Sequence, residues 1–421
     1  MGQASSTGNR LGSNEWRWAA FLLAALLFAA GCFGGKKDAN SQEAKALRAA
    51  GLDRSRTITI EPGQPIRIGV ASTLSGDLSA FGLAIADAAE TIPTSTAING
   101  HPIAFVREDD LCTADGGAAA ADRLIRAGVV AVVGPLCSGG VARSNPVFDR
   151  AGITHISVAA TRTDLTNPQR PEGPYVTFLR LAPIGKAEAA FQAQFAATRL
   201  GAKTAYIVSD GDLGPSDLAD QFIQAFRQSG GTVAGSPFTF SRQQSGWTEA
   251  MAAIKAANPG LIYFAGYCPE AATFLTALRA DPAFAHLPVM ATDGVRSPEL
   301  VTRAAAAAEG LYTVATTSRG TDWGTYEQEY RSRFKGEPAN VLYGAEAHDA
   351  TTAIIRALQN TAKDDGSRRL TIDLGQLNKA LRGSDFPGAS GPVKFGANGE
   401  RTATQFTVVQ IKGGQWVPVG S

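Results

Sequence analysis

Short apolar runs alternate with segments of helical spacing along most of this chain, and this alternation constrains the fold more than any other feature. The clearest run is 129–134 (VVAVVG), which has no polar side chain to turn toward water. Strands that are buried on both faces are typical of parallel sheets. Further strands are expected at 66–72, 101–109 and 153–159, with helices at 80–92, 114–128 and 140–152. The pattern predicts a doubly wound α/β sheet.

The alternation starts again in the second half of the chain. Strands are expected at 204–210, 231–240, 260–266, 287–293 and 310–316, and helices at 185–199, 214–229, 247–257, 269–281 and 297–307. A chain of 421 residues is long enough for two domains. Helical segments return at 322–335 and 342–361, and a β meander is expected at 391–419. This order predicts two α/β lobes that are each built from discontinuous segments.

The N-terminal segment is not expected to belong to the fold. Basic residues precede an apolar run at 18–31, which is the pattern of a secretory signal peptide. The run is shorter than the roughly 18–20 residues that span a bilayer comfortably. It ends in FAAGC, which resembles a bacterial lipobox, although Ala29 stands where leucine is usual. We therefore predict a signal peptide (1–31), a lipid on Cys32 and a polar tether (32–65), with an ordinary signal peptide as the alternative.

Charge and motifs exclude several classes of function. The net charge is +1 and the basic residues are scattered, so no nucleic-acid partner is expected. The chain has no G-x-S-x-G elbow, no phosphate-binding G-x-x-x-x-G-K-[ST] loop and no H-E-x-x-H motif. Its four histidines are far apart in sequence and form no ligand pair. We therefore expect no enzyme activity, no cofactor and no metal.

The stretch VVGPLCSGG (132–140) predicts a binding site. Ser138 stands where a helix N-cap is expected, directly after a buried strand. Open α/β sheets bind ligands at this kind of junction, and a helix N-terminus favours an anion such as a carboxylate. The next strand ends in a similar turn, with backbone groups or a hydroxyl at Ala159, Ala160 and Thr161. The two turns are expected to hold a carboxylate together; the alternative is a plain helix cap.

The cysteines allow one internal disulfide. The chain has four: Cys32, Cys112, Cys137 and Cys268. An exported protein can form disulfides. If Cys32 carries a lipid, three thiols remain, so at most one intramolecular pair forms and one cysteine is left over. The residues alone do not say which pair forms.

Several segments, in the same order, resemble the leucine/isoleucine/valine-binding proteins of ABC importers, which are type I periplasmic binding proteins. Beside VVGPLCSGG they are EDDLC, GITHISVAATRTDLT, LSGDLSAFG, IYFAGYCPE, MATDGV, VLYGAEAHDA and GPVKFGANGE. The resemblance covers about residues 66–415. It implies two lobes joined by three crossovers, near 182, 317 and 391. The first lobe would comprise 66–182 and 317–390, and the second 183–316 and 391–421.

The resemblance also assigns the site. It implies a disulfide between Cys112 and Cys137, which leaves Cys268 as the free thiol. Ser138, with the groups at Ala159 and Thr161, would bind the carboxylate of an amino acid and part of its ammonium group. Tyr267 and Asp293, where the family often has glutamate, would complete the ammonium site. The side-chain pocket would be lined by Phe81, Leu136, Leu213 and Tyr343.

The implied function is that of an extracytoplasmic solute-binding lipoprotein. It would bind an apolar amino acid, such as a branched-chain one, between its lobes and deliver it to a membrane permease. We expect a monomer anchored to the bacterial membrane by lipid. The alternatives are a ligand sensor of the same fold, a ligand that is a non-amino-acid amide or an aromatic acid, and an exported enzyme.

Overall fold

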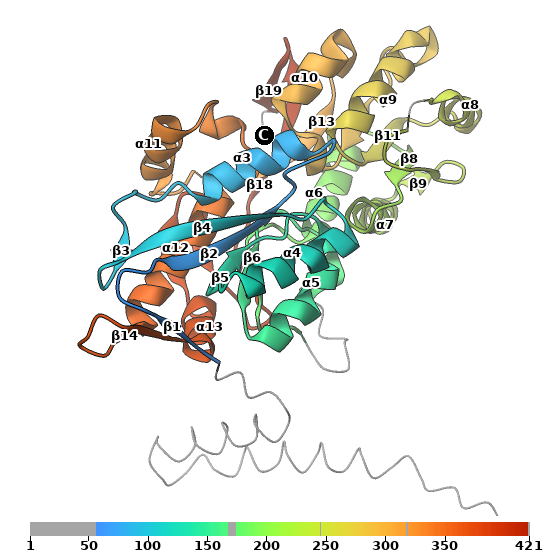
Figure 1. Ribbon diagram of the computed structural model, residues 1–421. Helices are drawn as coiled ribbons and strands as arrows, with labels where there is room; N and C mark the ends of the chain where they lie inside the picture. The colour runs from blue at the N-terminus through green and yellow to red at the C-terminus, as the bar shows by residue number, and fades with distance from the viewer. Residues whose placement is uncertain (1–55, 167–173, 245, 317–318, 420–421) are drawn as a thin grey trace, which may run out of the picture. The chain divides into compact units, whose positions relative to one another are not determined.

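A sheet of mainly parallel strands forms the first half of the fold. The computed structural model describes residues 56–166, 174–244, 246–316 and 319–419. From edge to edge, the first sheet contains β3 (Ala97–Ile98), β4 (His101–Asp109), β2 (Ile66–Ser72), β5 (Ala131–Val133), β6 (Thr154–Ser157) and β7 (Phe178–Arg180). All neighbouring strands are parallel except β3 and β4. It packs against α3 (Ser79–Ala89), α4 (Ala114–Arg126) and α5 (Ser138–Ala151), as Figure 1 shows.

The second sheet repeats this build with later segments. Its strands are, in order, β10 (Phe238–Phe240), β8 (Thr204–Asp210), β11 (Leu261–Ala265), β12 (Val289–Ala291), β13 (Tyr312–Thr316), β18 (Phe406–Lys412) and β19 (Gln415–Pro418), with β9 (Thr232–Val233) beside β8. The strands before β18 are parallel, and β18 pairs antiparallel with β13. The associated helices are α6 (Gly185–Thr198), α7 (Leu213–Gln228), α8 (Thr248–Ala257), α9 (Cys268–Ala280) and α10 (Pro298–Ala304).

Both sheets have the same strand order, and this order decides where a ligand can bind. In each, the first parallel strand in sequence lies between the second and the third: β2 between β4 and β5, and β8 between β10 and β11. The chain therefore leaves the first strand toward one edge of the sheet and later continues toward the other edge, so the strand order reverses between the first and the third strand. The carboxyl ends of the strands there form the usual ligand-binding crevice of doubly wound sheets.

Later segments of the chain return to the first sheet. The helices α11 (Trp323–Arg333), α12 (Gly344–Thr361) and α13 (Leu374–Arg382) follow the second sheet in sequence. α12 packs against α3 and β5, and its buried face belongs to the core of the first sheet. The described chain passes between the two sheets three times: between β7 and α6, between β13 and α11, and before β18. The predicted fold of two doubly wound lobes with three crossovers is confirmed.

The expected meander at 391–419 is wrong in its first part. The strand β17 (Gly391–Lys394) pairs with β16 (Asp385–Gly388) and not with β18. Val393 and Phe395 are buried in the core of the first sheet. Only the hairpin of β18 and β19 joins the second sheet. The sequence does not reveal this change of lobe, because β17 of the first lobe and β18 of the second follow one another along the chain without a helix between them.

The tether is also shorter than expected. β1 (Thr57–Ile60) pairs with β15 (Leu370–Asp373), which in turn pairs with β14 (Lys363–Asp364). Ile60 is buried in the first core, so the TITI sequence is an alternating strand and not a polar spacer. The predicted signal peptide, Cys32 and the tether up to residue 55 lie outside the described residues. None of the helices formed by the described residues is long and apolar enough to cross a membrane.

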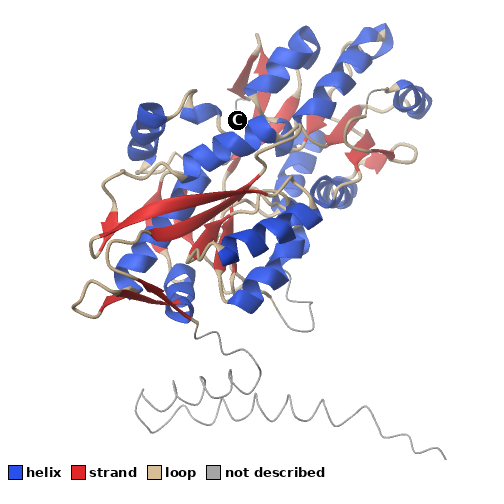
Figure 2. Ribbon diagram, in the orientation of Figure 1, coloured by secondary structure: helices blue, strands red, loops and turns tan. Residues whose placement is uncertain are grey.

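Two further elements, a strand and a helix, differ from the bounds predicted from the sequence. The expected strand at 231–240 is two short strands, β9 and β10, each paired with β8. α5 begins at Ser138 and continues through Pro146. Short 3-10 helices are η1 (Thr163–Thr166), η2 (Pro282–Phe284), η3 (Asp293–Val295), η4 (Ala305–Ala308) and η5 (Pro338–Asn340). Figure 2 shows the sheets with helices packed around them.

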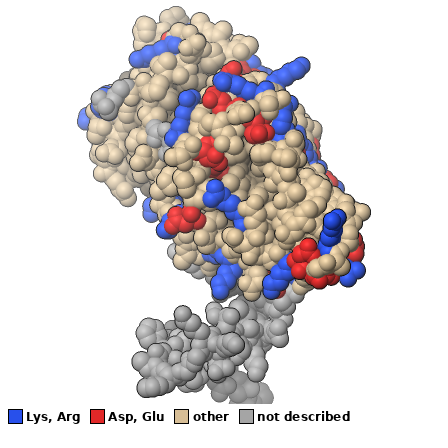
Figure 3. All heavy atoms as spheres, turned by 90° about the vertical axis from the view of Figure 1, so that its left-hand side faces the viewer, with Lys and Arg blue, Asp and Glu red and all other residues tan. Residues whose placement is uncertain are grey.

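The surface has no strong field of one sign on the face shown in Figure 3. Lysine and arginine side chains alternate there with aspartate and glutamate side chains. This mixture agrees with the net charge of +1 for the whole sequence. Such a surface provides no basic stripe on this face for a nucleic-acid backbone.

Candidate functional site

A small cavity of about 30 Å³ lies where the strand ends of the two sheets face each other. Its lining comes from both sheets: Phe81, Leu136, Cys137, Ser138, Ala159 and Thr161 follow strands of the first, and Gly214, Pro215, Leu218, Gly266, Tyr267, Thr292, Asp293 and Gly294 follow strands of the second, with Leu342 and Tyr343 before α12. The volume is sufficient for about two water molecules. A larger ligand therefore requires that the lobes separate or that lining side chains move.

The N-terminus of α5 faces this cavity. Cys137 occupies the cap position and Ser138 is the first helical residue, so the predicted role of Ser138 as the N-cap is wrong. Its hydroxyl instead accepts a hydrogen bond from the Arg162 N–H at 3.3 Å. The first N–H groups of any α-helix lack acceptors within the helix. α5 thus presents a hydroxyl and unpaired amide groups to the cavity, and the positive end of its dipole favours an anion.

The second sheet approaches this helix closely at Gly214, near the start of α7. A Cβ atom at Gly214 would lie 3.2 Å from the Ser138 hydroxyl oxygen and 3.7 Å from the Tyr267 hydroxyl oxygen. The first distance is tighter than ordinary packing, so any side chain at this position would press on Ser138. Glycine therefore keeps the space between the two helix N-termini open.

The turn after β6 is fixed by buried charged groups. The fully buried Arg180 donates hydrogen bonds to the carbonyl oxygens of Ala160 (3.3 Å) and Arg162 (2.6 Å), and it forms an ion pair with Glu400 at 2.6 Å. Ala159 and Thr161 line the cavity, whereas the side chain of Ala160 is fully buried and does not. Of the three residues predicted in this turn, two are therefore at the cavity.

Asp293 is the acidic group of the cavity. It follows β12 at the start of η3 and is buried, and its carboxylate accepts a short hydrogen bond from the Tyr343 hydroxyl. Burial raises the pKa of the Asp293 carboxyl, and the bond from Tyr343 opposes this shift. Tyr343 has a φ of 60°, an unfavourable backbone conformation for a residue with a large side chain. The rest of the fold therefore holds the tyrosine in place against this cost, with its hydroxyl on Asp293.

The apolar wall of the cavity is partly as predicted. Phe81, Leu136 and Tyr343 line it, together with Leu342. Leu213 is not among these lining residues. It is 44% exposed and lines an adjoining cavity of about 170 Å³ together with Ser138 and Tyr267. A second cavity of about 530 Å³ lies beyond Phe81 and Leu342 and also contains the buried free thiol of Cys268.

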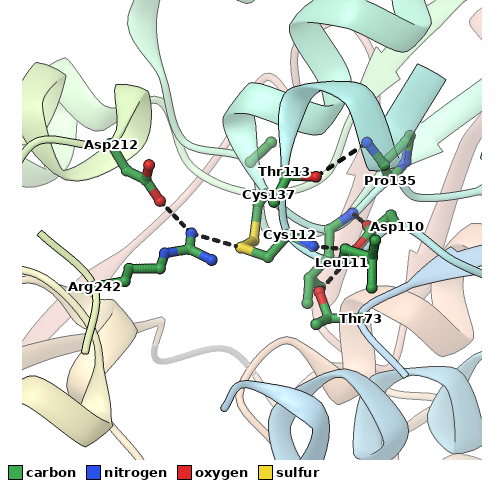
Figure 4. The surroundings of a disulfide bond; sticks show 12 residues. Thr73, Asp110, Leu111, Cys112, Thr113, Pro135, Cys137, Asp212 and Arg242 are labelled. Atoms are coloured by element: carbon green, nitrogen blue, oxygen red, sulfur yellow. Dashed lines mark hydrogen bonds and ion pairs between the residues drawn. A yellow bond between two sulfur atoms is a disulfide. The ribbon is translucent and has the colours of Figure 1, made fainter. Parts of the chain in front are cut away.

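The disulfide between Cys112 and Cys137 is present, which confirms the pairing that the resemblance implied. It joins the start of α4 to the start of α5. Beside it, the buried Asp110 accepts hydrogen bonds from the Thr73 hydroxyl (2.7 Å) and the Cys112 N–H (2.9 Å), as Figure 4 shows. It also accepts one from the Leu136 N–H (2.7 Å). Asp110 and the disulfide together fix the strand ends that carry Ser138.

Arg242 links the second sheet to this disulfide (Figure 4). Its guanidinium group donates to the Cys112 sulfur at 3.0 Å and forms an ion pair with Asp212. The same group lies 5.1 Å from the centre of the Tyr267 ring. A cation over an aromatic face is attracted to it. Arg242 thus connects the two lobes and orients the tyrosine at the cavity.

The comparison with protein families identifies the class of protein. The family model described as "Periplasmic binding protein" matches residues 65–415. The chain belongs to the periplasmic binding protein family. The resemblance inferred from the motifs is thereby confirmed.

Relatives of this periplasmic binding protein carry names that describe ligands. A leucine-, isoleucine-, valine-, threonine- and alanine-binding protein of Pseudomonas aeruginosa is 23% identical over 354 residues, which are 82% of this chain and 89% of the relative. The solved leucine binding protein of Thermotoga maritima has a TM-score of 0.74 at 23% identity and covers 84% of this chain and 98% of its own. A solute binding protein of R. palustris in complex with benzoate has a TM-score of 0.72 at 19% identity, with 85% and 96% covered. The two structures share its fold.

Sequence reasoning missed four residues that shape the site of this periplasmic binding protein. They are Asp110, Glu188, Gly214 and Arg242. Asp110 and Gly214 follow strands, which is a usable signal in a doubly wound fold. Glu188 reaches Asp293 through the packing of α6 within the second lobe, and Arg242 lies on a loop that meets Cys112 across the two lobes. The sequence carries no signal for either contact.

Proposed function

We propose that this chain binds an apolar L-amino acid between its lobes and delivers it to the membrane permease of an ABC importer. One observation carries the proposal. A single cavity is lined by a helix N-terminus with Ser138 from the first lobe and by the buried carboxylate of Asp293 from the second. These groups complement the two charges of a zwitterion. The ligand names of the relatives support the same class of ligand.

The carboxylate of the ligand is expected at the start of α5. There it would accept hydrogen bonds from the free amide groups and from the hydroxyl groups of Ser138, Thr161 and Tyr267, which all line the cavity. Hydrogen bonds to a charged group are shorter and stronger than neutral ones.

The ammonium group is expected at Asp293. A buried ammonium requires a counter-charge, and Asp293 is the carboxylate among the residues that line the cavity. The Tyr343 hydroxyl already donates a hydrogen bond to this carboxylate, so the carboxylate would accept hydrogen bonds from both the ligand ammonium group and the neutral tyrosine. The side chain of the ligand would point toward Phe81, Leu136 and Leu342 and extend toward the second, larger cavity.

Binding and closure would be coupled. The ligand can contact both lobes at once only when the strand ends of the two sheets face each other. It therefore favours the closed arrangement, in which it makes more contacts than in an open one. The contact of Arg242 with Cys112 and the hydrogen bonds from Thr163 N–H (2.8 Å) and hydroxyl (2.9 Å) to Asp217 also join the lobes in this arrangement. The closed form would dock on the permease, without chemistry on the ligand.

A second candidate is an aromatic acid. The benzoate complex of a protein with the same fold favours it, and a carboxylate at the start of α5 would serve both ligands. An aromatic acid has no ammonium group to compensate the buried Asp293 carboxylate, and the neighbouring Arg296 is shared with Glu346. We therefore prefer the amino acid.

The cellular setting is part of the same proposal. We place the protein outside the cytoplasm, on the signal-like segment at 1–31 and on the family match. A lipid on Cys32 would anchor a monomer to the membrane. The first lobe would comprise residues 66–182 and 317–395, and the second 183–316 and 396–421. The last boundary is moved from 391 because Phe395 packs in the first core.

Thermal unfolding with a panel of ligands tests the proposal. We expect L-leucine, L-isoleucine and L-valine at a hundred times their dissociation constant to stabilise the protein by about 2.7 kcal/mol, a rise in Tm of about 3 °C for a fold of this size. Benzoate and short amides should give no shift. A shift with benzoate and none with any amino acid would favour the aromatic-acid candidate and contradict the role of Asp293.

A further inference from the structure

A second carboxyl group lies directly behind Asp293 and is not explained by the site described so far. Glu188, in the first turn of α6, is fully buried. One carboxylate oxygen accepts the backbone N–H of Asp293 at 3.1 Å. The other oxygen is buried and has no hydrogen-bond partner among the described residues. A buried carboxylate with an unsatisfied oxygen is costly, so its retention next to the cavity calls for a role.

The groups around this pair are mostly acidic or neutral. Tyr343 from the start of α12 donates to Asp293, and Tyr263 on β11 donates to Gln192 at 2.7 Å, one turn along α6 from Glu188. Arg296, which follows η3, interacts with Asp293, but also with the buried Glu346. Lys186 shares the first turn of α6. The half-buried Arg296 is therefore shared between the buried carboxyl groups of Asp293 and Glu346.

Two buried carboxyl groups whose charges interact do not both ionise easily. Burial and the charge of Asp293 raise the pKa of the Glu188 carboxyl well above its usual range. Protons on such a pair belong to the two groups together, because each ionisation opposes the other. Loss of the last proton from this pair is therefore opposed until a positive charge is added.

We propose that Glu188 and Asp293 form a proton-sharing carboxyl pair that selects for a ligand ammonium group and releases its proton when that group binds. This inference rests on the proposed function and deepens it. The proton moves from the pair to solvent, and the ligand ammonium replaces it as the positive charge. A ligand that has a carboxylate but no ammonium cannot make this exchange, so the pair excludes aromatic acids.

Calorimetry with L-leucine at pH 5.5 to 7.5 tests the exchange. In buffers of different ionisation enthalpy, the parent should release about one proton per ligand at the acid end of this range, and the logarithm of its association constant should rise by up to about 1 per pH unit. Glu188→Gln keeps the acceptor for the Asp293 N–H but cannot carry the proton. In this variant we expect less than about 0.2 proton released and a nearly flat pH profile.

A matched control uses the same substitution at another buried glutamate. Glu270 also accepts one backbone N–H, from Gln243 at 3.1 Å, and does not line the cavity. Glu270→Gln should retain the proton release of the parent. Leucine binding without proton release in the parent, or with equal release in Glu188→Gln, would overturn the inference and leave the proposed function intact. Absence of leucine binding to the parent would overturn both.

The ligand-free protein provides a second readout. The pKa of Glu188 is raised in the folded protein, so the glutamate does not destabilise the fold below about pH 4.5. Above that pH the free energy of unfolding falls, and it continues to fall until the pH reaches the folded-state pKa. Glu188→Gln should therefore match the parent near pH 4.5 and exceed its Tm by about 2 °C or more at pH 8. A variant that is less stable than the parent at pH 8 would mean that Glu188 is ionised and satisfied in the fold, which contradicts the shared proton.

Discussion

Asp293→Asn is expected to weaken the binding of L-leucine about 100-fold or more. Removal of one partner of a buried ion pair typically costs about 3–5 kcal/mol, because the remaining charge stays buried without compensation. Here the remaining charge is that of the ligand ammonium group. The hydroxyl of Tyr343 is neutral and cannot replace the lost carboxylate as its partner. Titration calorimetry of the parent and the variant measures the ratio of dissociation constants directly.

Loss of binding in this variant should not result from unfolding. Burial raises the pKa of the Asp293 carboxyl, so its ionised form destabilises the ligand-free fold, and asparagine should leave the Tm unchanged or higher. Asp281→Asn is a suitable control in the same lobe, because Asp281 caps η2 and does not line the cavity. Leucine binding by Asp293→Asn within about threefold of the parent would mean that the ammonium group is held elsewhere.

Replacing both Cys112 and Cys137 with serine is expected to lower the free energy of unfolding by about 3 kcal/mol. The bond closes a loop with a sequence separation of 25 residues, and the estimate follows from the conformational freedom that such a loop loses in the unfolded chain. In a fold of this size the corresponding fall in Tm is about 4 °C. Leucine affinity should fall as well, since the bond fixes the start of α5 next to Ser138.

Reduction of the parent distinguishes the bond from the side chains. A reducing agent should lower the stability of the parent by about the same amount and leave the double variant unchanged. Cys268→Ala, which retains the disulfide, should remain sensitive to the reducing agent. If thiol titration shows complete reduction of the parent without a loss of stability, the bond does not contribute as described.

Much of the fold was predictable because its strands are continuous apolar runs that few other structures accommodate. The run 129–134 and its counterparts predict two parallel sheets, and glycines at the strand ends mark where chains turn. The first part of the segment 391–419 was assigned to the wrong lobe because consecutive alternating strands look alike whichever core they face. In the structure, Val393 packs in the first core and Ile411 in the second.

The site was predictable only where it follows the strand ends. Ser138, Thr161, Tyr267 and Asp293 each lie a few residues beyond a strand, and the structure brings all four to one cavity. Their roles in binding remain predictions. Glu188 could not be found in this way, because it lies on a helix and reaches Asp293 only through the packing of α6 on the second sheet. Leu213 lies beside this cavity and not in its wall, since it lines the adjoining one.

Calorimetry with L-leucine and two analogues tests the central claim most directly. Isocaproate retains the carboxylate and the branched chain of leucine but lacks the amino group, and isoamylamine lacks the carboxylate. If Asp293 and the start of α5 each bind one charge of a zwitterion, leucine should bind and both analogues should bind at least about 100-fold more weakly. Isocaproate that binds as tightly as leucine would contradict the account.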